Sequence, residues 1–64
     1  MTIGERLNLA ARGDIFTIIT PWARITNTRD FFLSCFEEAF FSLKIVRQTQ
    51  TEDGRNIIVT EGAE

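Results

Sequence analysis

The segment DFFLSCFEEAFFSLKIV, residues 30–46, decides the fold, because it holds five of the six phenylalanines of a 64-residue chain. At about 100° per residue on a helical wheel, most of its apolar side chains fall on one broad face. This pattern predicts one helix that begins at Asn27 as N-cap, has Asp30 near its start and ends near Ser42 or Leu43. An apolar face of this width is typical of a helix that lies on a sheet.

The same wheel divides the helix residues into a buried and an exposed set. Cys35 and Phe40 fall on the apolar face, so we expect Cys35 to be a small core residue. Phe41 falls in the middle of the polar face, beside Glu37 and Glu38. We therefore expect Phe41 to be exposed and available to another chain.

A first hairpin is predicted before this helix. Residues 5–11, ERLNLAA, place alternate apolar side chains on one side, which favours a strand. Residues 15–20, IFTIIT, are rich in β-branched side chains, and Gly13-Asp14 supplies a turn between the two segments. Pro21 cannot donate to a strand ladder, so the second strand should end by about Thr20 unless it lies at a sheet edge.

A helix over residues 2–12 is the alternative for the N-terminal segment. Thr2 and Glu5 have the spacing of a capping box, and Gly13 could end such a helix. After the phenylalanine-rich segment, LKIVRQTQ (43–50) and RNIIVTE (55–61) flank a turn sequence with Asp53-Gly54. These two segments predict a second hairpin.

The expected architecture is a single small α+β domain, residues 1–64, with the order β-β-α-β-β. One helix packs on an antiparallel sheet of two hairpins, or the order becomes α-β-α-β-β if residues 2–12 are helical. One helix on one sheet leaves the second sheet face open. The residues expected on that open face are Ile15 and Ile19, with either Ile58 or the pair Ile57 and Val59.

Composition excludes several classes of function. The chain has no histidine and a single cysteine, so it can form neither an intramolecular disulfide nor a standard zinc site, and the thiol has no histidine to activate it. No glycine-rich phosphate-binding motif occurs, and we expect no cofactor, no metal and no enzymatic activity. With no signal peptide and no apolar run near the ~20 residues of a membrane span, we expect a cytoplasmic protein without membrane contact.

These features favour a small protein-interaction module that forms a homodimer and acts as an adaptor or steric inhibitor of a larger protein or complex. Small acidic proteins of this kind include phage proteins that inhibit CRISPR complexes, an analogy that rests on size and a net charge of −2 alone. Aromatic anchors with an acidic rim would make the contact. The residues expected at the partner or dimer interface are Phe41, Glu37, Glu38, Phe31, Trp22, Ile15 and Ile19.

The alternative is a nucleic-acid-binding or regulatory protein that uses an arginine-bearing sheet face. The arginines expected on it are Arg6, Arg12, Arg47 and Arg55. The predicted strands lack surface aromatic residues on which bases could stack, so this alternative is less favoured.

Overall fold

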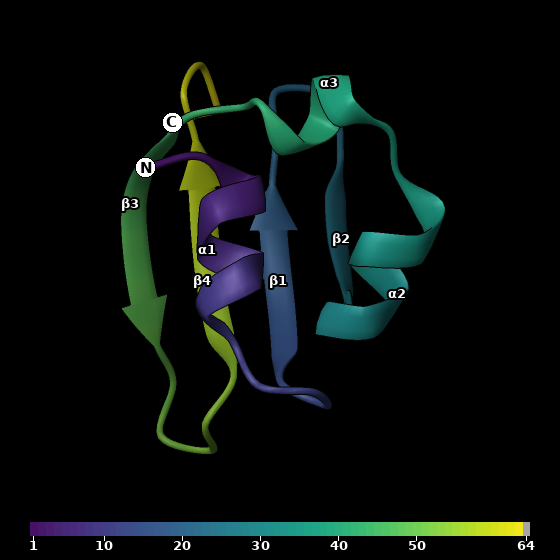
Figure 1. Ribbon diagram of the computed structural model, residues 1–64. Coiled ribbons are helices and arrows are strands. Elements are labelled where there is room, and N and C mark those ends of the chain that lie inside the picture. Colours follow the sequence, from purple (N-terminus) through teal and green to yellow (C-terminus); the bar gives the residue numbers. More distant parts are fainter. Residues whose placement is uncertain (64) are drawn as a thin grey trace.

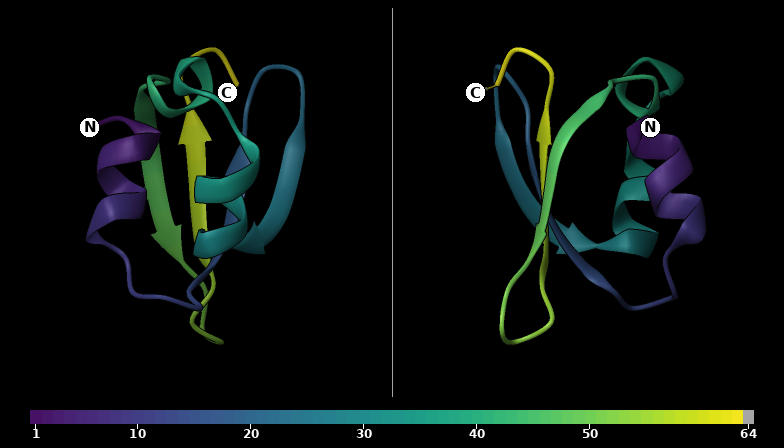
Figure 2. Two further views of the ribbon diagram at one scale, coloured as in Figure 1. Left: turned by 45° about the vertical axis from the view of Figure 1, so that its right-hand side comes forward. Right: turned by 90° about the vertical axis from the view of Figure 1, so that its left-hand side faces the viewer.

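In residues 1–63, which the computed structural model describes, a four-stranded sheet carries three short helices on one face (Figure 1). Seen edge-on, the helices form a layer on one side of the sheet (Figure 2). The predicted α+β class is confirmed. The elements in chain order are α1 (Ile3–Leu9), β1 (Ile15–Ile19), β2 (Arg24–Thr28), α2 (Arg29–Cys35), α3 (Glu38–Phe41), β3 (Ile45–Gln50) and β4 (Asn56–Thr60).

The sheet contains two hairpins, but only the second is the predicted one, because β1 pairs with β2 and not with residues 5–11. The sheet is mixed rather than antiparallel. Its strand order is β2-β1-β4-β3, with antiparallel pairs β1/β2 and β3/β4. The central pair, β1 and β4, is parallel. The crossover explains this, because α2 and α3 carry the chain from the end of β2 back to the opposite end of the sheet (Figure 1). β4 therefore runs in the same direction as β1.

The N-terminal segment is a helix, so the strand predicted over residues 5–11 is wrong and the helical alternative is correct. Both halves of the capping box form: the Thr2 hydroxyl accepts from the Glu5 amide at 3.3 Å, and Glu5 Oε1 accepts from the Thr2 amide at 3.0 Å. Ile3 and Leu7, one helical turn apart, are fully buried, and the alternating Leu9 is exposed. The capping box and the burial of Ile3 and Leu7 favour the helix more than the period-two pattern favours a strand.

β1 consequently pairs with β2, a strand that the sequence does not predict. The turn between β1 and β2 is held by Thr20, whose amide donates to the Ala23 carbonyl at 2.8 Å and whose hydroxyl accepts from the Ala23 amide at 3.0 Å. Pro21 lies inside this turn, where it needs no amide donor. β1 ends at Ile19, as Pro21 predicts.

The predicted long helix is broken in two. Phe36 and Glu37 are extended, with φ/ψ of −119°/158° and −95°/170°, and they separate α2 from α3. The N-cap of α2 is Thr28 rather than the predicted Asn27, because the Thr28 hydroxyl accepts from the Phe31 amide at 3.2 Å. Side-chain directions taken from one continuous wheel therefore fail after the break.

Five phenylalanine rings form one cluster around the break, with Phe31 edge-on to Phe32 and Phe36. The Phe36 and Phe40 rings stack at 4.2 Å between centroids, and Phe32 stacks on both at 5.6 Å and 6.1 Å. Phe41 meets Phe40 edge-on at 5.8 Å. The fully or almost fully buried apolar residues of the core are Ile3, Leu7, Phe16, Ile18, Phe32, Phe40 and Ile58.

Phe41 is half-buried against this core, which corrects the expectation that it is exposed. It lies under α1, where Gly4 allows close approach. A Cβ placed on Gly4 would lie 3.1 Å from the Phe41 Cβ and 3.3 Å from the Phe41 carbonyl oxygen. Cys35 shows the opposite error, because the thiol expected in the core is exposed.

Candidate interaction surfaces

A groove of about 420 Å³ opens between the β1–β2 turn and the break between α2 and α3. We call it the Trp22 groove. Its residues come from the β1–β2 turn and from residues 35–40. The extended backbone at Phe36 and Glu37 makes room for the groove. The residues that line it are Trp22, Cys35, Phe36, Glu37, Ala39 and Phe40.

The Trp22 groove combines a projecting indole with an aromatic lining. Trp22 is 69% exposed, the largest exposed fraction among the aromatic residues of the described chain. Phe40 is buried and Phe36 half-buried, and their stacked rings give the groove a rigid wall. Glu37 is exposed and adds one negative charge. The arrangement can bind an apolar side chain, and it holds no histidine that could activate the Cys35 thiol.

Only some of the predicted interface residues meet at this groove. Trp22 and Glu37 line it, and Phe31 is adjacent, 37% exposed and edge-on to Phe36 at 6.1 Å. Glu38 is exposed in the first turn of α3. Phe41 is absent from the lining because it packs under α1.

Ile15 and Ile19 lie on the sheet face away from the helices, which we call the open face. Phe16 and Ile18 point into the core, so the alternate β1 side chains point the other way. The register adds Ile57 and Val59 beside them, while Ile58 is buried, so the second of the two expected sets is correct. The strand residues that the register places on the open face are Ile15, Thr17, Ile19, Arg24, Thr26, Thr28, Arg47, Thr49, Ile57 and Val59.

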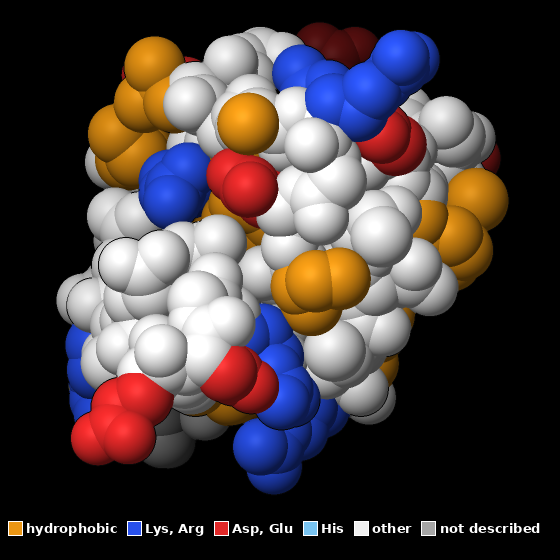
Figure 3. All heavy atoms as spheres, turned by 90° about the horizontal axis from the view of Figure 1, so that it is seen from below, with side chains coloured by type: hydrophobic (Ala, Val, Ile, Leu, Met, Phe, Trp, Pro, Cys, Tyr) orange, Lys and Arg blue, Asp and Glu red, His pale blue; other side chains and the backbone are white. Residues whose placement is uncertain are grey.

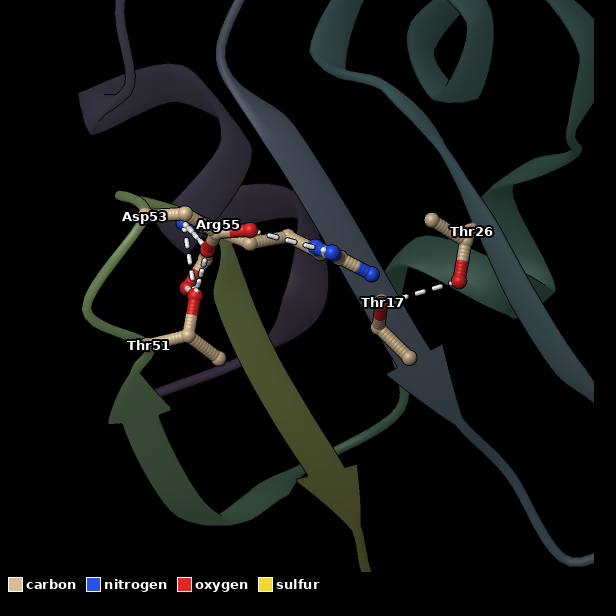
Figure 4. Close-up of polar contacts among 5 residues, drawn as sticks. All are labelled: Thr17, Thr26, Thr51, Asp53 and Arg55. Carbon is tan, nitrogen blue, oxygen red and sulfur yellow. Dashed lines mark hydrogen bonds and ion pairs between the residues drawn. The ribbon is translucent and has the colours of Figure 1, made fainter.

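The β3–β4 loop forms one wall of a hollow at the end of the open face, lined by Ile15, Thr26 and residues 53–55. Asp53 accepts hydrogen bonds from the Thr51 hydroxyl and from Arg55 (Figure 4). The Thr51 hydrogen bond and then those of Arg55 lower the pKa of Asp53 to about 2. The hydroxyls of Thr17 on β1 and Thr26 on β2 form a hydrogen bond of 2.8 Å (Figure 4).

The four arginines of the nucleic-acid alternative do not share a face. Arg6 lies on α1, donates to Gln48 and Asn56, and its guanidinium carbon lies 5.1 Å from the Phe16 ring centroid. Arg12 lies in the α1–β1 loop, 3.7 Å from Asp30. Arg55 pairs with Asp53 in the β3–β4 loop at 3.1 Å. Of the four, only Arg47 has a place in an open-face strand.

Charge at one end of the molecule is mixed rather than gathered by sign. Looking onto the end of the molecule that carries the β3–β4 loop, acidic and basic side chains lie between separate hydrophobic areas (Figure 3). Within residues 1–63, no three His, Cys, Asp or Glu side chains come together as a possible metal site. No helix in the same range is long and apolar enough to cross a membrane.

No protein-family model matches the chain, and neither a curated protein nor a solved structure shows significant similarity to it. Function has therefore to be inferred from the two surfaces, the Trp22 groove and the open face.

Proposed function

We propose that the chain is a small non-enzymatic protein-interaction module that binds its partner through the Trp22 groove and acts as an adaptor or steric inhibitor. One observation carries this proposal: Trp22 is 69% exposed at the edge of an apolar groove. Tryptophan is enriched among the residues that dominate binding energy, particularly beside well-packed pockets. Leaving an indole in water in a domain so short of core has no structural benefit that we can identify.

The same surface supports self-association, and we include a homodimer in the proposal. A two-fold interface uses one patch on both subunits, so the patch has to be complementary to itself. The Trp22 groove holds a projecting side chain and a recess side by side, and each indole can enter the recess of the other subunit. Glu37 opposes this contact, because dimerisation brings the Glu37 carboxylates of the two subunits close together unless both stay at the rim of the groove.

The single tryptophan gives a direct test of self-association. The chain has no tyrosine, so excitation at the red edge reports on Trp22 alone. We expect the emission to shift to the red on dilution through the micromolar range as the indole returns to water. Sedimentation over the same range should move from about twice the chain mass to 7.3 kDa.

Two alanine variants distinguish association through the Trp22 groove from nonspecific association through exposed apolar side chains. Trp22→Ala should sediment as a monomer, whereas Leu9→Ala should behave like the parent chain. Leu9 is a matched control because it is 71% exposed and lies at the end of α1, away from the β1–β2 turn (Figure 1). A parent chain that is monomeric with solvent-exposed emission at every concentration would refute the homodimer and leave partner binding to be tested separately.

A further inference from the structure

The open face has the composition of a surface that is covered by another layer. All-parallel sheets occur almost only with both faces covered, and this mixed sheet has one parallel pair at its centre. The central pair β1 and β4 is parallel and apolar on both sides: Phe16 and Ile18 face the helices, and Ile15 and Ile19 face away. Ile15 is 39% exposed, and no helix of residues 1–63 lies on this face (Figure 2), although residues 53–55 of the β3–β4 loop border Ile15 at one end of it.

One row of side chains crosses the open face from edge to edge. Arg24 on β2 pairs with Ile19 on β1, Ile19 with Val59 on β4, and Val59 with Arg47 on β3. Two aliphatic side chains are therefore flanked by one arginine on each edge strand. With strands about 4.8 Å apart, the two arginine Cα atoms are separated by roughly 14 Å. An α-helix with its side chains is about 10–12 Å wide, so it fits between them.

The charge on this face selects among possible occupants. None of the strand residues on it is acidic, and neither Arg24 nor Arg47 makes an ion pair within the described chain. A second copy placed face to face would bring arginines toward arginines. A nucleic acid would find no aromatic ring for its bases and only two widely spaced unpaired arginines.

We propose that the open face binds an amphipathic helix of a partner protein, one with an aliphatic stripe bordered by acidic residues. The stripe packs on Ile19, Ile57 and Val59, and the acidic borders meet Arg24 and Arg47. This completes a helix–sheet–helix sandwich around the parallel pair. The inference goes beyond the proposed function, because it uses the face opposite the helical layer and leaves the Trp22 groove free.

A synthetic peptide provides the probe. A fluorescein-labelled peptide of about 18 residues, with leucine at helical spacing and glutamate on both borders of the stripe, is titrated with the protein by fluorescence anisotropy. We expect saturable binding that weakens with salt, since the arginine contacts are exposed. A peptide of the same composition with the leucines scattered around the helix should bind at least about tenfold more weakly.

Charge reversal locates the site. Arg24→Glu and Arg47→Glu should each weaken peptide binding about tenfold, while Arg12→Glu should leave it unchanged. Arg12 is a suitable control because its side chain is 89% exposed and lies off the open face. Ile57→Thr tests the aliphatic stripe and should also weaken binding, and circular dichroism of each variant verifies that the fold persists.

The outcomes are distinct. Binding that Trp22→Ala abolishes and Arg24→Glu spares would place the peptide in the groove and overturn the open-face assignment, while supporting the proposed function. Absence of peptide binding by the folded parent chain would overturn it too. Tight binding of a uridine oligonucleotide, lost in Arg24→Glu, together with no peptide binding, would assign the face to nucleic acid instead.

Discussion

Two neighbouring phenylalanines show how a local break changes the role of a side chain. A continuous helix would hold Phe40 and Phe41 about 100° apart, with Phe41 in water. Because the chain is extended at Phe36 and Glu37, α3 is reoriented and both rings reach the core. Phe40 stacks within the aromatic cluster, and Phe41 fills the space that Gly4 leaves under α1.

Both residues should therefore matter for stability, to different degrees. We expect Phe40→Ala to lower the free energy of unfolding by about 3–5 kcal/mol, and Phe41→Ala by about 2–3 kcal/mol because it is only half-buried. Urea denaturation followed by circular dichroism measures both, with Leu9→Ala as a surface control expected within about 0.5 kcal/mol of the parent chain. A Phe41→Ala variant as stable as that control would mean that Phe41 is a surface residue after all.

At the scale of elements, the β3–β4 turn has its own dependence on pH. The pKa of Asp53 is about 2 in the folded chain, against an ordinary value of 3.8, chiefly because the Thr51 hydroxyl and then Arg55 hydrogen-bond to the carboxylate. A folded-state pKa below the unfolded value means that the ionised carboxylate favours the fold. That contribution is complete above about pH 3.8 and is lost as the pH falls through about 2.

Carbon-13 NMR of the Asp53 carboxyl can follow this titration. We expect a midpoint near 2 in the folded protein and near 3.8 in protein unfolded by urea. Thr51→Val removes the first of the causes, so it should raise the folded midpoint toward the unfolded one. Identical midpoints in the folded and unfolded protein would show that the turn does not hold the carboxylate as described.

Elements with strong local signals were predictable from the sequence, and those set by distant contacts were not. The second hairpin was expected over residues 43–50 and 55–61, where β3 and β4 lie, because Asp53-Gly54 marks its turn. The sequence of α1 contains both the capping pair Thr2 and Glu5, which predicts a helix, and the alternation of Leu7 and Leu9, which favours a strand. The break at Phe36 carries neither glycine nor proline, so no local signal in the sequence marks it.

Individual residues of the candidate site could be predicted from the sequence, but their arrangement in a groove could not. Trp22 and Glu37 are among the residues predicted at an interface, and both line the groove, although the sequence favours Trp22 as a plug at one end of the core and the structure leaves it exposed. The groove itself could not be foreseen, since it exists because α2 and α3 are separate helices. Arg24 could not be placed from the sequence because no strand is predicted over residues 24–28. The register of β2 puts Arg24 on the open face.

At the scale of the whole molecule, stability should be highest at the centre of the sheet. The backbone groups of β1 and β4 are paired with strands on both sides, whereas β2 and β3 each have one free edge. In hydrogen-exchange NMR we expect the amides of Ile18 and Ile58 to exchange only through global unfolding, with the strong urea dependence that this implies. Outward-facing edge amides should exchange faster, with little urea dependence. Equal protection on all four strands would mean that the edges are covered in solution.

The place of β4 in the sheet also shapes how the chain reaches its native state. The two strands of each hairpin are close in sequence. The two halves of the sheet join only where β4 meets β1. That contact links residues 41 positions apart, such as Asn56 and Ile15. Long-range pairing of this kind slows folding, so docking of the two preformed halves should set the rate. Before docking, β1 and β4 each present an unpaired apolar edge. The same seam can close between two molecules, which makes exchange of whole hairpins the characteristic misassembly of this chain at high concentration.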